Sequence, residues 1–174
     1  EQLAKVDTLV FDKTGTITKG KFVVTQIKPM NGYSEKELLD LAAIAESHSN
    51  HPIAQAIREK AGVVNDSASI ENYEEIPGHG VRVNYKGTEI TAGNDKILHL
   101  DLIEHDKCEL SETVVHIAMN KKYAGFISVS DEIKEDSAEA FNELKSIGID
   151  QQIILTGDNK KSADAVSQLV NADK

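Results

Sequence analysis

The 174-residue chain carries 29 acidic and 19 basic side chains, which gives a formal net charge of −10. This charge argues against nucleic acid as a partner, because proteins bind phosphate backbones through basic patches. A hydrophobic fraction of 40% with 28% charged residues is typical of a globular protein with one medium or two small domains. The single cysteine, Cys108, excludes an internal disulfide, and no stretch approaches the ~20 apolar residues of a membrane-spanning helix.

The first third of the chain predicts two strands and then two helices. Apolar runs rich in Val, Leu, Phe and Ile favour an extended chain, and Lys19-Gly20-Lys21 is predicted to separate the two strands. Ser34 followed by Glu37 is a capping-box signature for the first helix, and His51-Pro52 begins the second. The predicted elements are strands 6–11 and 22–27 and helices 34–47 and 51–61.

The middle of the chain changes to short strands joined by tight turns, such as Lys86-Gly87, which predict antiparallel hairpins. The last part returns to helix, short apolar strand and helix, an order typical of a parallel sheet. The middle elements are strands 70–76, 81–85, 88–92, 114–120 and 123–129, with a short helix over 94–100. The last elements are helix 135–147, strand 152–155 and helix 160–170.

This order of patterns predicts an α/β protein with an insertion. Residues 1–18 and 126–174 would form an incomplete Rossmann-like domain, because each contributes to a parallel sheet. Residues 19–125 would form an α+β domain built on an antiparallel sheet and inserted after the first strand. The expected hinges lie near residues 18–21 and 125–130.

The most informative motif is Asp12-Lys13-Thr14-Gly15-Thr16, which follows directly on the first apolar strand. A carboxylate carried from a buried strand onto a turn can accept a phosphoryl group, so Asp12 is the candidate nucleophile. Lys13 supplies positive charge, Thr14 and Thr16 offer hydroxyl and N–H groups to phosphate oxygens, and Gly15 allows the main chain to approach a ligand. An ordinary polar turn after a strand would not account for all five residues in this order.

A second polar segment, Thr156-Gly157-Asp158, follows the last apolar strand. Parallel α/β sheets bind ligands at the carboxyl ends of their strands, so we expect Thr156 to lie at the same edge as Asp12. A helix-capping role could instead explain Asp158 or Asn159, because a helix is predicted from residue 160.

Four features of the middle could bind a nucleotide. They are a glutamate where one helix ends, a His-Pro pair where the next begins, a Gly-x-Gly turn that lets a strand approach a ligand, and a Gly-Asn pair at a strand-to-helix turn. Each has a simpler interpretation when taken singly, since such a histidine often caps a helix and Gly-x-Gly is a common turn. The other five histidines are scattered and show no metal-ligand spacing. The candidate residues are Glu46, His51, Gly78, Gly80, Gly93 and Asn94.

Together these motifs resemble the P-type ATPases, ion pumps whose headpiece belongs to the haloacid dehalogenase superfamily. Residues 12–18 and 156–159 are similar to motifs of the phosphorylation domain, and the four features of the middle mark the heavy-metal-transporting subclass. Residues 93–99 and 149–159 look more like zinc and cadmium exporters than copper exporters. The resemblance implies an incomplete haloacid-dehalogenase-like phosphorylation domain, formed by residues 1–18 and 126–174, and an inserted nucleotide-binding domain.

The resemblance also implies a mechanism, in which the γ-phosphate of ATP is transferred to Asp12 to drive metal export across a membrane. Mg²⁺ would lie near Asp12 and Thr14, and the six candidate residues of the middle would surround adenine and ribose. Asp131 would be an acidic hinge, although a cap for the helix predicted from residue 135 is an equal alternative. The implied catalytic residues are Asp12, Lys13, Thr14, Thr156, Gly157 and Asp158.

The partners implied by the resemblance are ATP and the rest of the same pump, namely its membrane domain, its actuator domain and the remainder of its phosphorylation domain. This segment would lie at the cytoplasmic face of a membrane, and the transported ion would pass through membrane helices. The family's Gly-Asp-Gly-x-Asn-Asp segment, which supplies a second Mg²⁺ carboxylate, does not occur in this sequence. We therefore expect a truncated domain that binds ATP or ADP weakly and does not turn over.

Two alternative functions remain open. A stand-alone phosphatase of the haloacid dehalogenase type would hydrolyse p-nitrophenyl phosphate, but such enzymes usually carry a second aspartate where this chain has Thr14. Threonine at that position favours a long-lived aspartyl phosphate. A non-catalytic nucleotide-binding module would instead bind ATP and become active only when another chain completed it.

Overall fold

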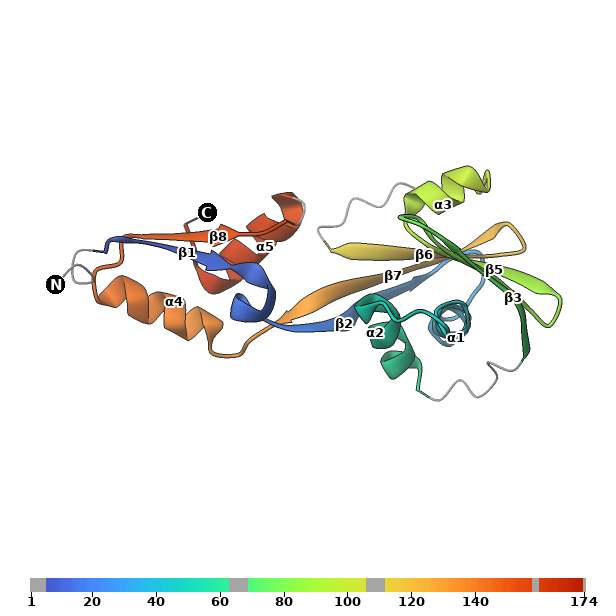
Figure 1. Cartoon of the computed structure of the whole chain (residues 1–174), viewed down its shortest axis with the longest axis horizontal. Helices are drawn as coiled ribbons and strands as arrows, with labels where there is room; N and C mark the ends of the chain where they lie inside the picture. Colours follow the sequence, from blue (N-terminus) through green and yellow to red (C-terminus); the bar gives the residue numbers. More distant parts are fainter. Residues whose placement is uncertain (1–5, 63–68, 106–111, 158–159, 174) are drawn as a thin grey trace. The chain divides into compact units, whose positions relative to one another are not determined.

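The computed structural model describes residues 6–62, 69–105, 112–157 and 160–173, and the chain divides into two compact units (Figure 1). One unit combines the two ends of the chain, Glu1–Lys21 and Asp131–Lys174, and the other is the continuous stretch Phe22–Ser130. We call them the split unit and the inserted unit. Two strands, β2 (Thr18–Pro29) and β7 (Lys122–Ile133), pass from one unit into the other.

In the split unit, a two-stranded parallel sheet packs against two helices. Its strands run side by side with Asp12 opposite Leu155, so that both strands end at the same edge. Its elements are β1 (Thr8–Asp12), β8 (Gln151–Leu155), α4 (Ser137–Ser146) and α5 (Lys160–Val170).

The two faces of this small sheet differ, because successive side chains of a strand point to opposite sides. On the packed face, the rings of Phe11 and Phe141 lie 4.6 Å apart between centroids. On the other face, Val10 is 59% exposed and Leu155 is 64% exposed. The buried core of the unit consists of Ile17, Phe141, Ile154, Val166 and Val170.

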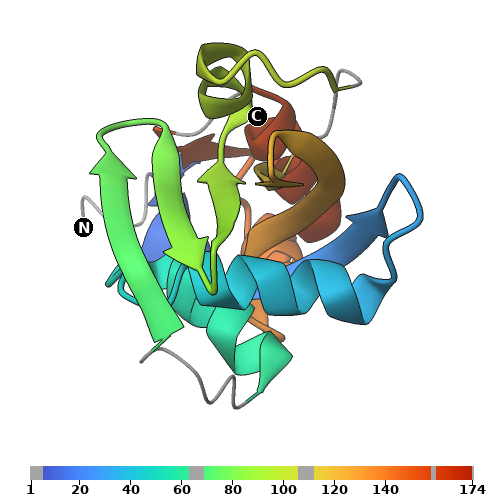
Figure 2. The same cartoon turned by 90° about the vertical axis from the view of Figure 1, so that its right-hand side faces the viewer.

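In the inserted unit, a six-stranded sheet has the order β2-β7-β6-β5-β4-β3, and neighbouring strands from β7 to β3 pair antiparallel. Helices α1 and α2 lie on one side of this sheet and α3 on the other (Figures 1 and 2). The remaining strands are β3 (Ile70–Ile76), β4 (Gly80–Tyr85), β5 (Thr88–Gly93) and β6 (Thr113–Met119), and the helices are α1 (Glu35–Ala45), α2 (Pro52–Ala61) and α3 (Asp95–Leu100). The predicted α/β fold class with an inserted antiparallel sheet is confirmed.

The sheet separates two cores in the inserted unit, as the alternation along β5 shows. Ile90 and Ala92 belong to the core beneath α1 and α2, whereas Thr91 between them contacts Asp101 on the α3 side. The core on the α1 side includes Leu38, Ala42, Ile57, Val83, Ile117 and Ile127. The smaller core on the α3 side consists of Ile97, Leu98, Ile103, Ala118 and Tyr123.

The helix ends follow the local signals in the sequence. Ser34 and Glu37 form both hydrogen bonds of the predicted capping box at the start of α1. The ring of His51 caps α2, Pro52 occupies its first turn, and Gly62 ends it with a φ of +78°. The predicted bounds of β3 and α5 agree with those of the structure.

Near the boundaries of the units, the predicted break at residues 19–21 and the helix-cap alternative for Asp131 are both wrong. Residues 19–21 do not separate two strands, because β2 already begins at Thr18 and Lys19 forms an ion pair of 2.5 Å with Glu132 of β7. Asp131 does not cap a helix, because it lies within β7, and α4 is preceded by Asp136 instead. In both cases pairing along β7 keeps the chain extended where the local sequence suggests a break.

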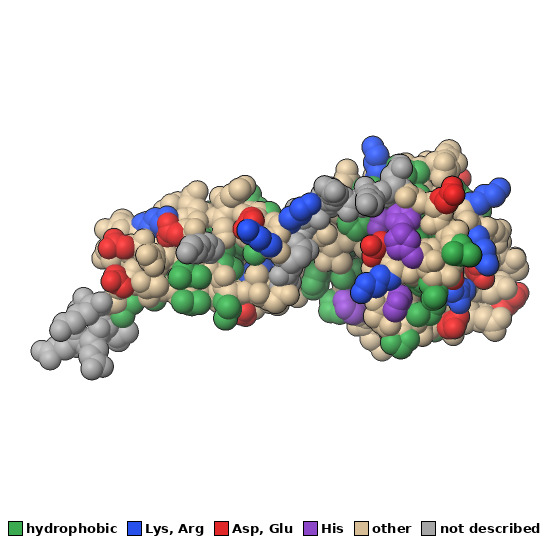
Figure 3. Space-filling model, turned by 90° about the horizontal axis from the view of Figure 1, so that it is seen from above, with side chains coloured by type: hydrophobic (Ala, Val, Ile, Leu, Met, Phe, Trp, Pro, Cys, Tyr) green, Lys and Arg blue, Asp and Glu red, His purple; other side chains and the backbone are tan. Residues whose placement is uncertain are grey.

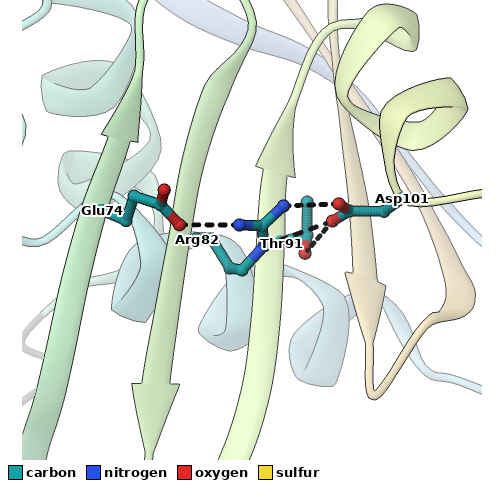
Figure 4. Close-up of polar contacts among 4 residues, drawn as sticks. All are labelled: Glu74, Arg82, Thr91 and Asp101. Atoms are coloured by element: carbon teal, nitrogen blue, oxygen red, sulfur yellow. Dashed lines mark hydrogen bonds and ion pairs between the residues drawn. The ribbon is translucent and has the colours of Figure 1, made fainter.

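On the α3 side of the sheet, a network of polar side chains ties α3 to three strands (Figure 4). Arg82 of β4 donates to Glu74 of β3 at 2.6 Å and binds both carboxylate oxygens of Asp101 at the end of α3. The hydroxyl of Thr91 of β5 lies 3.4 Å from the same carboxylate. The Asp101 side chain is 8% exposed, whereas that of Glu74 is 62% exposed, so the two ion pairs differ in burial.

This difference in burial predicts that removing the Asp101 carboxylate lowers the free energy of unfolding more than removing the Glu74 carboxylate. Asp101→Ala should lower the free energy of unfolding by about 2–3 kcal/mol, because it leaves a half-buried guanidinium without its main partner. Glu74→Ala should cost less than about 1 kcal/mol, because an exposed ion pair is screened by water. Urea denaturation followed by circular dichroism measures both values, and equal losses would contradict this account.

Candidate active site

Asp12 ends strand β1 in an exposed position at the carboxyl edge of the two-stranded sheet. Because Leu155 lies opposite Asp12, the next residue of the neighbouring chain segment is Thr156, followed by Gly157. The structure thus brings the ends of β1 and β8 together, as the parallel pattern predicts. Asp158, the last of the predicted catalytic residues, lies outside the described residues, as does the single cysteine, Cys108.

The turn after Asp12, residues 13–17, has an irregular backbone that explains its glycine. Gly15 has a φ of +78°, a left-handed conformation that favours glycine. A Cβ placed on Gly15 would meet nothing within 4 Å among the described residues, so backbone conformation rather than crowding requires glycine in this structure. Thr14 and Thr16 are exposed on the turn, and Lys13 is buried at 6% exposure.

The turn is held by Thr18, whose role the motif did not reveal. The fully buried Thr18 hydroxyl donates to Asp131 Oδ2 at 2.6 Å and accepts from the N–H of Gly15 at 3.2 Å. Lys134 donates through its Nζ to the Gly15 carbonyl at 3.1 Å, and the Ser137 hydroxyl donates to the Ile17 carbonyl at 2.8 Å. The segment that begins at Asp131 therefore fixes the turn that follows Asp12.

In the inserted unit, two of the predicted glycines face each other across neighbouring strands. Gly80 of β4 is the register partner of Gly93 of β5. A Cβ on Gly80 would lie 2.6 Å from the Cα of Gly93, and a Cβ on Gly93 would lie 2.7 Å from the Cα of Gly80. Both distances are too short for any side chain, so the close approach of two backbones by itself requires both glycines.

Asn94 links this glycine pair to the turn before β4. Its backbone N–H donates to the His79 carbonyl at 2.8 Å, and its Nδ2 donates to the Gly78 carbonyl at 2.8 Å. Its Oδ1 accepts from the N–H of Lys96 at 3.1 Å and so caps α3. The predicted Gly-x-Gly and Gly-Asn features therefore form one hydrogen-bonded structure.

Glu46 and His51 stand at the two ends of the connection between α1 and α2. Glu46 ends α1, and His51 caps α2 by accepting at Nδ1 from the N–H of Ile53 at 3.2 Å. This bond leaves the proton of the neutral ring on Nε2, which is therefore a hydrogen-bond donor. Arg58 of α2 holds the connection by donating to the carbonyls of Glu46 and, at 2.8 Å, Ser49.

Glu46 is 8% exposed, and this burial raises the pKa of its carboxyl group to about 6. A hydrogen bond from Ser49 and the charge of Arg58 lower the pKa, and the charge of Glu75 raises it. Glu75 lies on β3 opposite Val81, next to the Gly78–Gly80 turn. Glu46 is therefore within electrostatic reach of the strand that leads into that turn.

Histidine side chains gather on the α3 side of the inserted unit, where no nucleotide residue was predicted (Figure 3). The ring of His105 lies 5.1 Å from that of His99 and 5.2 Å from that of His116, and His116 Nδ1 is 2.8 Å from the Tyr123 hydroxyl. Burial and the nearby His105 lower the pKa of His116 to about 4. An open pocket of about 1050 Å³ lies beside His99 and His105, and none of the predicted nucleotide residues lines it.

The described residues contain no group of three or more His, Cys, Asp or Glu side chains placed to hold a metal ion. Within the same residues, no helix combines the length and apolar character needed to cross a bilayer.

Comparison with protein families defines the class of protein. Residues 6–174 match the family described as haloacid dehalogenase-like hydrolase. An exposed aspartate at the end of a strand in a parallel sheet, with a threonine after the neighbouring strand, agrees with this match. The chain belongs to the haloacid dehalogenase-like hydrolases.

Within this family, the chain is similar to heavy-metal pumps. It is 48% identical over 173 residues to the zinc-transporting ATPase of Synechocystis sp., covering 99% of this chain and 24% of that protein. It is 50% identical over 168 residues to the cadmium, zinc and cobalt-transporting ATPase of Bacillus subtilis, covering 97% of this chain and 24% of that protein. The structure of a zinc-transporting PIB-type ATPase in the E2.Pi state matches 98% of this chain and 29% of that one, with a TM-score of 0.77 and 32% identity.

These similarities confirm the resemblance to the heavy-metal-transporting P-type ATPases, and to zinc and cadmium transporters in particular. The chain spans about a quarter of the length of the curated relatives that it matches.

The buried carboxyl group of Glu46 predicts a pH-dependent stability. Its pKa is raised from 4.5 to about 6, so the folded state holds this proton more tightly than the unfolded chain. The stability of the wild type relative to Glu46→Gln should therefore fall by ~2 kcal/mol as the pH rises from about 4 to about 7. Urea denaturation across this range measures the difference, with Glu71→Gln on the exposed part of β3 as the control, and a constant difference for Glu46 would contradict the prediction.

Proposed function

We propose that this chain is the ATP-binding and phosphoryl-accepting region of a heavy-metal-transporting P-type ATPase, with Asp12 as the phosphoryl acceptor. The observation that carries the proposal is the exposed Asp12 at the end of β1, beside the strand end that leads into Thr156. The similarity to zinc- and cadmium-transporting pumps supports it. In this proposal the split unit is the phosphorylation domain and the inserted unit is the nucleotide-binding domain.

The proposed reaction is an in-line displacement at phosphorus. A carboxylate oxygen of Asp12 bonds to the γ-phosphorus of ATP, the bond from that phosphorus to the bridging oxygen breaks, and ADP leaves with the electron pair. Lys13 supplies positive charge beside the transferred group, and the Thr156 hydroxyl donates to an oxygen of that group. Gly157 keeps the backbone next to this group open, and Asp158 helps the nucleotide-bound domain to dock.

The base and ribose of ATP are proposed to bind to the inserted unit. Glu46 accepts from the exocyclic amine of adenine, and the ring of His51 stacks on the purine or donates to it from Nε2. The hydrogen-bonded structure around Asn94 holds the backbone of Gly78, Gly80 and Gly93 beside the base and ribose. A Cβ on Gly78 would meet nothing within 4 Å among the described residues, so a ligand can approach the backbone there.

The residues at the end of β1 suit Mg²⁺, which prefers oxygen ligands and uses only one or two protein carboxylates beside phosphate and water. Asp12 is an exposed carboxylate there, and Thr14 is an exposed oxygen-bearing neighbour. These two residues would hold the ion, which when bound neutralises phosphate charge. Since the described residues offer no group of three acidic, histidine or cysteine ligands, phosphate and water would complete its coordination.

Other parts of the same protein are proposed as partners. The exposed apolar side chains of Val10 and Leu155 lie on the sheet face away from α4 and α5, and further segments of the phosphorylation domain would cover them. A membrane domain would carry the metal ion, zinc or cadmium by similarity, and an actuator domain would act on the aspartyl phosphate. This region would then lie at the cytoplasmic face of the membrane, and by itself it would bind nucleotide without turnover.

The acceptor role is tested by phosphorylation of the whole pump that contains this chain. With γ-labelled ATP, the wild type should carry an acid-stable, hydroxylamine-sensitive label, and Asp12→Asn should abolish it because an amide cannot displace ADP. Asp7→Asn, before the start of β1, is the matched control and should be labelled normally. Full labelling of the Asp12 variant would exclude this residue as the acceptor.

The nucleotide role is tested by titrating the 174-residue chain with ADP. His51→Asn should weaken binding roughly tenfold, because it removes a ring worth about 1–2 kcal/mol against a base while an asparagine can still cap α2. His99→Asn, on the α3 side, should leave the affinity unchanged. Isothermal titration calorimetry gives both affinities, and equal behaviour of the two variants would contradict the placement of the base.

A further inference from the structure

Two hydroxyl groups near Glu46 are buried without a hydrogen-bond partner among the described residues. They are Tyr73 Oη and Ser47 Oγ. Buried polar atoms nearly always have a partner, because leaving one unpaired costs the free energy of its lost hydration. Two such atoms on different elements suggest that a ligand supplies what the protein does not.

Tyr73 and Ser47 lie in one polar environment with Glu46. Tyr73 is on β3, opposite Val83, and its ring meets that of His48 edge-on at 5.3 Å. His48 belongs to the connection between α1 and α2 that also holds Ser47. Burial raises the pKa of Tyr73, and the charges of Glu46 and Glu75 raise it further against the opposing charge of Arg58. The phenol therefore stays protonated and is a donor at neutral pH.

The charges in this environment indicate which part of a nucleotide would enter it. The carboxyl groups of Glu46 and Glu75 act on Tyr73, and among the described residues the charge of Arg58 opposes them, so a triphosphate is repelled. An uncharged group with its own donors and acceptors is accepted instead. The base fits this requirement and the phosphates do not.

We propose that Tyr73 recognises the base of the nucleotide. The Tyr73 hydroxyl donates a hydrogen bond to a ring nitrogen of adenine, and the Glu46 carboxylate accepts one from the exocyclic amine. This inference rests on the proposed nucleotide-binding function and deepens it. Adenine presents an amine donor beside a ring-nitrogen acceptor, whereas guanine presents an oxygen acceptor at the position of that amine. The acceptor on Glu46 and the donor on Tyr73 therefore complement adenine. With guanine, the oxygen acceptor of the base would face the acceptor on Glu46.

The test compares Tyr73→Phe with wild type in titrations with ADP and GDP. ADP affinity should fall about tenfold, because one hydrogen bond to a buried site is lost. GDP affinity should change less than twofold, so the preference for adenine should shrink. Tyr33→Phe is the matched control, because Tyr33 loses the same atom while packed against the same core.

A second measurement separates recognition from misfolding. Without nucleotide, Tyr73→Phe should melt at the same or a higher temperature than wild type, because it removes a buried hydroxyl that has no partner in the described part of the chain. A variant that is at least as stable and yet binds ADP more weakly supports the inference.

Unchanged ADP affinity in Tyr73→Phe, or an equal loss for ADP and GDP, would overturn the role of Tyr73 while leaving the proposed function intact. If the wild-type chain binds neither nucleotide, the proposed function fails and this inference fails with it.

Discussion

The hydrogen bond between Thr18 and Asp131 holds the turn that follows the candidate nucleophile, Asp12. These residues are 113 positions apart, yet the Thr18 hydroxyl donates to the Asp131 carboxylate and accepts from the turn that follows Asp12. Both side chains are buried, so the Asp131 carboxylate gains from Thr18 a hydrogen bond that water does not supply. The whole inserted unit lies between them in the sequence. The turn after Asp12 can therefore take its final form only when the chain returns from the inserted unit in the correct register.

A different constraint shapes the candidate nucleotide site. The backbones of β4 and β5 approach so closely that Gly80 and Gly93 exclude any side chain, and Asn94 locks the adjoining turn. These features would be needed for packing even if no ligand bound there. The buried groups around the connection between α1 and α2 are therefore a stronger indication of a nucleotide than the glycines are. Glu46 is a buried carboxyl group, and the buried hydroxyl of Tyr73 has no hydrogen-bond partner among the described residues, so packing alone does not account for these two polar groups.

Local signals explain which parts of the fold could be predicted from sequence. The capping box at Ser34, the His-Pro pair and the alternation of β3 each act over a few residues, and the corresponding elements are found as predicted. Residues 19–21 suggest a break because their extended form depends on β7, which is distant in sequence. The partnership of Thr18 with Asp131 was not predictable either, since no local pattern connects two residues separated by an inserted unit. The common location of Asp12 and Thr156 could be predicted, because parallel strands place their carboxyl ends at one edge of the sheet.

The cap formed by His51 has a consequence for how a ligand would be held. Its Nδ1 accepts a hydrogen bond from the N–H of Ile53, and this bond favours one rotamer and one tautomer of the imidazole before any ligand binds. A side chain that is already ordered loses less conformational entropy when a ligand binds. The hydrogen bond to the first turn of α2 therefore lowers the entropic cost of a contact between the His51 ring and a ligand.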